Sequence, residues 1–173
     1  MPKAVSPRFP LVLLAGLVLL AGCATPASVS VGETTTEVAA RFPKPDARVK
    51  LADGGERWQY PSAPMGVDAY MIDFGPDGRV RSVTQALTPE NFYKNLQPGL
   101  TKDQVRTLLG KPGVESWYPR LQQDVMTWRY YDIGEINPFR QLDVFFSMAD
   151  GRLLYYTMTP DKAFDPGGGG ERP

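Results

Sequence analysis

The hydrophobic positions in the second half of the chain follow first a helical and then a strand period. Within residues 102–109 the apolar side chains recur at the spacing of one helix face. Residues 125–131 and 142–148 then direct alternate side chains to two faces, as half-buried strands do. The tight-turn dipeptide Asp150-Gly151 precedes a last apolar segment, residues 153–158. This pattern predicts one helix followed by an antiparallel meander.

A capping-box pattern marks the start of this helix and recurs in the first half of the chain. Thr101 is followed three residues later by Gln104, and Thr34 is followed by Glu37 in the same way. Glycine or proline ends both segments, because these residues terminate helices. We therefore expect a helix near the start of each half and a further short helix at residues 88–92.

The two halves of the chain also match each other in order and residue type. The offset between matching residues drifts from 67 to 73 positions, as a few loop insertions would produce. Such self-similarity is the signature of a repeat. It predicts an α+β fold of two tandem helix-plus-meander repeats, residues 29–97 and 98–164. The matching pairs include Gly32/Gly99, Thr34/Thr101, Val38/Val105, Trp58/Trp128 and Asp77-Gly78-Arg79/Asp150-Gly151-Arg152.

The first 23 residues have the features of an export signal. Lys3 and Arg8 precede the apolar run 11–20, which is shorter than the roughly 17–20 residues that span a bilayer. The run ends in Leu20-Ala-Gly-Cys23, which resembles the lipobox of bacterial lipoproteins. The resemblance implies a signal peptide of residues 1–22 and a Cys23 that receives a diacylglycerol and an N-acyl chain. The alternative is an ordinary secretory signal with a cysteine there by chance.

Acylation at Cys23 would determine the location of the protein. Cys23 is the single cysteine of the chain, so its acylation would leave no free thiol. Ala24 follows it, where Asp commonly marks inner-membrane retention, so the resemblance implies a lipid anchor in the outer membrane with the folded body facing the periplasm. Residues 23–28 would form a lipidated linker, and the glycine-rich tail 165–173 is expected to be disordered.

Composition removes several classes of function. Lys plus Arg and Asp plus Glu both total 19, and this zero net charge argues against a nucleic-acid partner. Without histidine, and with one cysteine, the chain has no Ser-His, Cys-His or His-metal site. We expect no catalytic residues, metal, cofactor or small-molecule substrate. The carboxylates weighed for a catalytic pair, none of them spaced to guarantee one, are Asp73, Glu115, Asp124 and Asp143.

The second repeat resembles the SmpA/OmlA (BamE-like) family of outer-membrane lipoproteins. Residues 99–112 match its pattern Gly-Met-Thr-x-x-x-Val-x-x-x-x-Gly-x-Pro, with Leu100 in place of Met. The Trp-x-Tyr pair at residues 128–130 and the Asp-Gly-Arg turn follow in the same order. The first repeat matches more weakly, with Glu33 at the Met position and Pro43 at that of the helix-ending Gly. The resemblance implies this fold and a binding module of the cell envelope.

Two such units in one chain are similar in architecture to the β-lactamase inhibitor proteins, which leaves two functional hypotheses. The first is a lipid-anchored periplasmic binding or scaffold module that serves envelope or outer-membrane protein assembly and integrity. Its partners would be envelope proteins such as assembly-machine subunits. The second is a lipoprotein inhibitor or ligand-sequestering module. Crosslinking in the envelope would distinguish them, because the first predicts assembly-machine subunits and the second a single soluble target.

Side-chain alternation predicts the partner surface. If Trp128 and Tyr130 pack under the helix, their neighbours must point to the opposite face of the sheet. Exposed aromatic side chains together with an arginine are common interface anchors. The residues predicted to bind the partner are Arg129, Tyr131, Phe145 and Tyr155. The alternative is that this face packs against the sheet of the first repeat, in which case the partner site would lie on loops 117–124 or 134–140.

Overall fold

The computed structural model describes residues 24–164. The predicted signal peptide (1–22), Cys23 and the tail 165–173 lie outside the described residues. Among residues 24–164 no helix is long and apolar enough to cross a membrane. The elements follow in the order η1 (Pro26–Ser28), α1 (Thr35–Arg41), β1 (Ala47–Lys50), β2 (Glu56–Pro61), β3 (Ala69–Phe74), β4 (Val80–Gln85), α2 (Pro89–Asn95), α3 (Lys102–Leu109), β5 (Val114–Tyr118), η2 (Pro119–Leu121), β6 (Gln123–Tyr131), β7 (Phe139–Ser147), β8 (Leu153–Pro160) and η3 (Lys162–Phe164).

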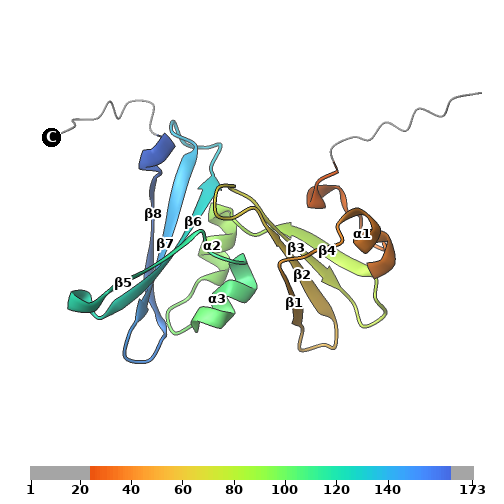
Figure 1. Cartoon of the computed structure of the whole chain (residues 1–173), viewed down its shortest axis with the longest axis horizontal. Coiled ribbons are helices and arrows are strands. Elements are labelled where there is room, and N and C mark those ends of the chain that lie inside the picture. Colours follow the sequence, from red (N-terminus) through yellow and green to blue (C-terminus); the bar gives the residue numbers. More distant parts are fainter. Residues whose placement is uncertain (1–23, 165–173) are drawn as a thin grey trace, which may run out of the picture.

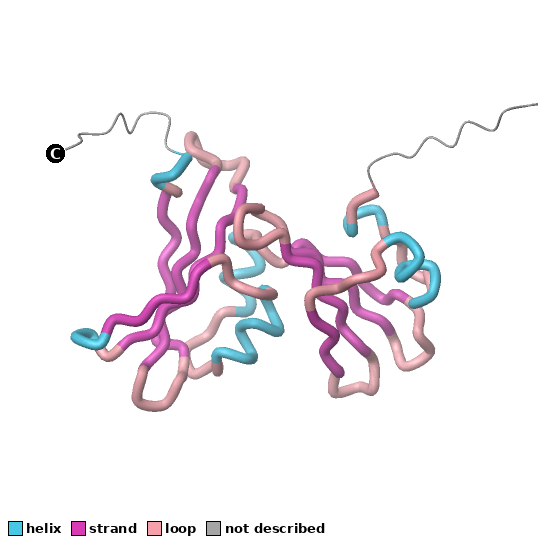
Figure 2. Tube along the Cα trace, in the orientation of Figure 1, coloured by secondary structure: helices cyan, strands magenta, loops and turns pink. Residues whose placement is uncertain are grey.

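The strands form two four-stranded antiparallel sheets, β1-β2-β3-β4 and β5-β6-β7-β8. Helix α1 lies on one side of the first sheet, and α2 and α3 lie between the two sheets (Figure 1). The tube in Figure 2 shows the same alternation of helices and sheets. The predicted α+β fold of two tandem helix-plus-meander units is confirmed. The boundary between residues 97 and 98 stays a prediction.

Both predicted capping boxes are present. The Glu37 N–H donates to Thr34 Oγ1 at 3.3 Å, and the Thr34 N–H donates to the Glu37 carboxylate at 2.7 Å. Thr101 and Gln104 form the equivalent pair at 3.2 and 2.8 Å. Helix α3 ends at Gly110, whose φ of 80° is a left-handed conformation that favours glycine. The local sequence therefore fixes both ends of α3.

The same hydrogen bonds close each unit between its first and last segments. The Gly32 N–H donates to the Val80 carbonyl, and the Gly99 N–H donates to the Leu153 carbonyl, both at 2.8 Å. The arginine of each Asp-Gly-Arg turn then donates to the carbonyl of the same glycine, at 2.9 Å in the first unit and 2.8 Å in the second. The repeat seen in the sequence is therefore a repeat of the bonding pattern as well.

Each sheet also has a β-bulge at the same place in its last hairpin. The extra residue is Arg81 in the first unit and Leu154 in the second. Because of this bulge Leu153 is buried in the core, whereas Tyr155 pairs with Phe145 on the opposite face. Strict alternation from Leu153 would have placed Tyr155 in the core.

The larger hydrophobic cluster lies between the two sheets and includes α2 and α3. Ala69 and Met71 of the first sheet belong to it, together with the buried face of the second sheet. A smaller cluster lies between α1 and the other face of the first sheet, around Trp58 and Ile72. Most side chains that alternation places on one face of the second sheet are buried under α2 and α3, namely Met126, Trp128, Tyr130, Leu142, Val144 and Phe146. Met148, which continues the same alternation, lies beyond the end of β7 and is exposed.

Polar contacts also join α3 to the first sheet. Arg57 Nη1 donates to the Thr107 carbonyl at 3.1 Å, and Gln59 Nε2 donates to the Arg106 and Thr107 carbonyls at 3.1 and 3.0 Å. These carbonyls belong to the last turn of α3, where the Arg106 carbonyl also accepts the Gly110 N–H at 2.8 Å. Asp73 holds Arg57 through an ion pair at 2.6 Å, and this hydrogen bonding raises the pKa of Arg57.

The contact between the two units therefore differs from the alternative that the sequence left open. The first sheet packs against α2 and α3, and not against the sheet face of Tyr131 and Phe145. Each sheet has two faces. Alternation assigns side chains to them without showing which face the neighbouring unit covers. The outer face of the second sheet is consequently open to solvent, with Tyr131 and Tyr155 each 45% exposed.

The free energy of unfolding is expected to decrease between about pH 10 and pH 12, in part through Tyr60. Burial raises the pKa of Tyr60 from 10.0 to about 12, and its hydroxyl donates to the Phe42 carbonyl at 3.0 Å. In this pH range the unfolded chain has lost the Tyr60 proton while the folded chain retains it, so rising pH favours unfolding. Tyr60→Phe should therefore make the loss of stability from pH 8 to pH 11 smaller in urea unfolding. An unchanged pH dependence would contradict this role.

Candidate functional site

The outer face of the second sheet contains a groove of about 430 Å³. Strands β5, β6 and β7 form its floor, and Leu121 of η2 lies at its end. Helices α2 and α3 lie on the other side of this sheet (Figure 1). We call this surface the open face. The residues that line the groove are Val114, Ser116, Tyr118, Leu121, Val125, Thr127, Gln141, Asp143 and Phe145.

Phe145 and Tyr155, two of the predicted partner-binding residues, lie together on the open face. Their rings stack with centroids 4.5 Å apart and an interplanar angle of 15°. The Tyr155 hydroxyl donates to Gln123 Oε1 at 3.4 Å. Both rings stand on paired strands of the sheet, so little conformational entropy would be lost when a partner binds them.

Arg129 and Tyr131, the other two predicted residues, form a second group toward the end of β6. The Arg129 guanidinium makes an ion pair with Asp161 at 2.8 Å, and its side chain is 23% exposed. Tyr131 packs edge-to-face against Phe139 with ring centroids 5.3 Å apart. All four predicted residues therefore belong to strands of the second sheet, but Arg129 is already engaged by a carboxylate of its own chain.

The polar centre of the groove is a closed hydrogen-bond network. Thr127 Oγ1 donates to Asp143 Oδ1 at 2.6 Å, and Gln141 Nε2 donates to the two Asp143 oxygens at 2.9 and 3.0 Å. This carboxylate is bonded to two neutral side chains, Gln141 of its own strand β7 and Thr127 of the adjacent strand β6. The groove therefore offers a fixed polar patch flanked by the aromatic rings of Tyr118 and Phe145.

The other carboxylates weighed in the sequence also have partners in the structure. Asp73 pairs with Arg57 and accepts two hydrogen bonds from it, at 2.6 and 2.8 Å. Glu115 accepts two bonds from Arg106, both at 3.0 Å, and Asp124 pairs with Lys102. Within residues 24–164 no group of three or more His, Cys, Asp or Glu side chains could hold a metal ion.

The hairpin between β5 and β6 is a functional candidate that the sequence reasoning placed only in a loop. Strand β5 pairs with β6 as far as Tyr118 opposite Gln123, so Trp117 and Tyr118 belong to a strand. Trp117 is 70% exposed, Tyr118 is 48% exposed and Leu121 is 64% exposed. Tyr118 and Leu121 line the groove as well, so this hairpin extends the apolar surface of the open face. The dense apolar run Trp117-Tyr-Pro-Arg-Leu121 was the available signal.

The repeat allows the open face to be compared with the same face of the first sheet. Residues 57 and 59 of β2 correspond to residues 127 and 129 of β6. In the first unit this face is covered, since Arg57 and Gln59 bind the last turn of α3 and Met71 lies in the shared core. The groove over the second sheet is lined by residues of the second unit alone. This face of the first sheet is thus covered by α3, whereas the equivalent face of the second sheet is open.

Comparison with known proteins gives only distant similarities. No protein-family model matches the chain, and no curated protein matches it. Among solved structures it is similar to a "putative beta-lactamase inhibitor protein" from Streptococcus mutans, with 16% identity, 82% of this chain and 89% of that chain covered, and a TM-score of 0.30. It is also similar to a DUF4309 family protein (YjgB) from Bacillus subtilis, with 18% identity, 75% and 79% covered, and a TM-score of 0.29. Similarity at this level carries no function to this chain, and membership of the SmpA/OmlA family stays a prediction.

Proposed function

We propose that this chain is a protein-binding module and that the open face of its second sheet binds the partner. The proposal rests on one observation: in the first unit the equivalent face of the sheet is covered by α3 of the neighbouring unit. A face of the same construction is open in the second unit and presents stacked Phe145 and Tyr155 beside a groove. Exposed aromatic clusters of this kind are common interface anchors.

We further propose that Cys23 anchors the module to the outer membrane and that the folded body of the module faces the periplasm. Acyl chains on Cys23 would supply the anchor, and the signal-like segment before it supports this location. The partner would be an envelope protein, with assembly-machine subunits as the first class.

Phe145→Ala is expected to weaken capture of the partner by at least tenfold, about 1.4 kcal/mol. The change removes one ring of the stacked pair while leaving the buried face of β7 intact. Partner capture would be measured by crosslinking in intact envelopes through a photoreactive amino acid at Tyr155. Mass spectrometry of the crosslinked species then names the partner. Recovery of assembly-machine subunits supports the first hypothesis, and recovery of one soluble enzyme supports an inhibitor.

Two controls separate a binding defect from a folding defect. Tyr93→Ala truncates an aromatic ring that is 62% exposed on α2, away from the open face, and should leave capture unchanged. A photoreactive residue at Lys50, whose side chain is 83% exposed in β1, should give no such crosslink. The proposal fails if Phe145→Ala captures its partner normally, or if the Lys50 position crosslinks the same protein equally well.

Mass spectrometry of the mature N-terminus is expected to find an acylated Cys23 as the first residue. Cys23→Ala should leave an uncleaved precursor or a mislocalised chain. The reason is that the lipobox-like segment resembles a signal that is cleaved just before a cysteine that becomes acylated. Ala24→Ser is a matched control that leaves the cysteine in place. An unmodified Cys23 in the mature chain would end the lipoprotein proposal and leave the open face as a separate question.

A further inference from the structure

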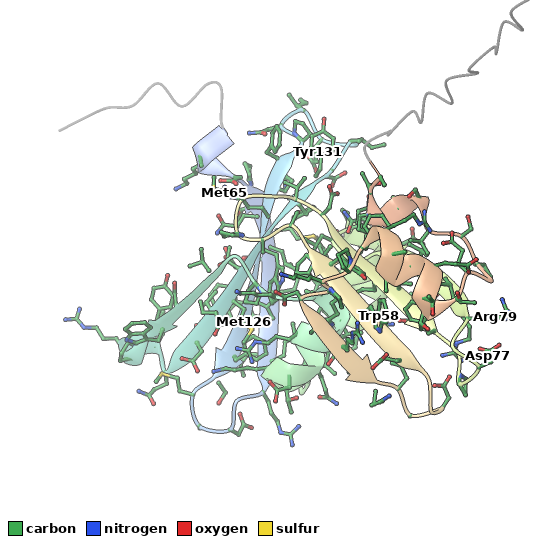
Figure 3. All side chains as sticks on the ribbon, turned by 45° about the vertical axis from the view of Figure 1, so that its right-hand side comes forward. Trp58, Met65, Asp77, Arg79, Met126 and Tyr131 are labelled. Carbon is green, nitrogen blue, oxygen red and sulfur yellow. The ribbon has the colours of Figure 1, made fainter. Side chains whose placement is uncertain are left out.

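Two equivalent hairpin loops lie at the same end of the molecule. The β2–β3 loop spans residues 62–68, and the β6–β7 loop spans residues 132–138. Each is closed by the same backbone hydrogen bond at 2.8 Å, from the first residue of the loop to the carbonyl of the last. Met65 and Tyr131, which mark these loops, are both in the upper part of the molecule in Figure 3, and the loops are in the upper part of Figure 1 as well.

The tips of these loops expose aliphatic side chains to an unusual degree. Ile133 is 90% exposed, Ile136 is 105% exposed and Met65 is 71% exposed. Three other hairpins, at the opposite end of the molecule, have polar Asp-Gly turns at residues 53–54, 77–78 and 150–151. Figure 3 shows Asp77 and Arg79 at the right-hand edge of the molecule, below Met65 and Tyr131. The fourth hairpin at this opposite end, β5–β6, exposes Trp117 and Leu121 instead. Three of the four tips at that end are therefore polar, whereas both tips at the end of the β2–β3 and β6–β7 loops expose aliphatic side chains. We call Met65, Ile133 and Ile136 the apolar end.

The start of the described chain lies at this apolar end. Thr25 and Pro26 share a hollow with Ser62 and Asp68, the two residues at the base of the β2–β3 loop. Figure 1 shows the chain entering the fold from the same side. Cys23 precedes Ala24 directly, so only Cys23 and Ala24 separate an acyl chain from this hollow.

We propose that the apolar end lies on the bilayer and that Ile133, Ile136 and Met65 insert into its interfacial layer beside the acyl chains of Cys23. This inference rests on the anchor in the proposed function. A lipid surface can bury single aliphatic side chains at loop tips, and the gain adds to that of the acyl chains. Both acidic groups of the β6–β7 loop already have partners within the fold, since Asp132 accepts the Gly134 N–H at 3.0 Å and Glu135 pairs with Arg140 at 3.4 Å.

The test measures how deeply the tip enters a bilayer in the full mature lipoprotein. Ile136→Cys would be labelled with the environment-sensitive fluorophore NBD, after purification of the protein and its reconstitution into phosphatidylethanolamine–phosphatidylglycerol vesicles. Acylated Cys23 has no free thiol, so the label reaches only the new cysteine. Met148→Cys is the matched control, because Met148 is 41% exposed in the β7–β8 turn at the opposite end.

The expected result is at least about twofold more quenching by nitroxide-bearing lipids at residue 136 than at residue 148, with a blue-shifted emission only at residue 136. Met65→Cys should follow residue 136. Equal quenching at residues 136 and 148 in an acylated protein would overturn the inference and leave the proposed anchor standing. If the wild-type chain takes up label, Cys23 is free and the anchor proposal fails. In that case vesicles are added to the unanchored Cys23→Ser chain labelled at residue 136. Quenching of this label would support insertion of the apolar end into the bilayer, and a lack of quenching would overturn it.

Discussion

Trp128→Ala is expected to lower the free energy of unfolding by about 3 to 5 kcal/mol, as truncation of a buried aromatic usually does. The Trp128 side chain is 1% exposed and lies in the cluster shared by the two units. Its indole N–H donates to the Gly110 carbonyl at 3.3 Å, where α3 ends. The substitution would leave a cavity under α3 and an unpaired carbonyl at its end. Urea denaturation followed by circular dichroism measures the loss.

Trp117→Ala provides the matched control for this truncation. Trp117 is 70% exposed at the end of the β5–β6 hairpin, so its removal should change the free energy of unfolding by less than about 0.5 kcal/mol. A loss below 1 kcal/mol for Trp128→Ala would show that the buried face of the second sheet has been assigned wrongly. The difference between the two tryptophans therefore tests the direction of the β6 side chains.

Met71→Asp is expected to cost about 3 to 5 kcal/mol, the range for an uncompensated charge in a protein interior. Met71 is 2% exposed, and its methyl carbon would lie 3.2 Å from a Cβ added at Gly110. A carboxylate there would stand between the first sheet and α3, within the apolar cluster. Because that cluster joins the two units, the variant should weaken their contact as well as the first sheet.

Met65→Asp is the control, since it places the same charge on a methionine that is 71% exposed. Its free energy of unfolding should change by less than about 0.5 kcal/mol.

Calorimetry of Met71→Asp should also show two thermal unfolding transitions, one for each unit. A single transition at the wild-type temperature would mean that Met71 does not lie in the contact between the units.

Most of the helices and strands could be predicted from the sequence because their signals are local. Both capping boxes and the Asp-Gly-Arg turns act over a few residues, and alternation placed Trp128 and Phe145 on the correct faces. The first strand of each sheet was harder to predict. Strands β1, with the sequence Ala-Arg-Val-Lys, and β5 are edge strands with exposed positions throughout, so their hydrophobic pattern is weak.

The candidate site could be predicted only in part. Leu153 and Leu154 are both apolar, so the sequence does not determine the register of the last strand. The bulge at Leu154 is what directs Tyr155 to the open face. The ion pair of Arg129 with Asp161 joins strand β6 to the residue after β8, a contact that no local pattern encodes. The packing of α3 on the first sheet is likewise a contact between distant segments, set by the fit of Met71 and Gln59 to that helix.

The bonds that close each unit determine the order in which the chain can fold. They join residues 47 and 53 positions apart, so neither unit is complete before its last strand is available. When the chain emerges with its N-terminus first, the first unit can close before α3 has emerged. Met71 and Ala69 then face water, although both are buried in the complete fold. Folding from the N-terminus therefore passes through a half-built molecule with an uncovered apolar strip, and the arrival of the second unit removes this aggregation-prone surface.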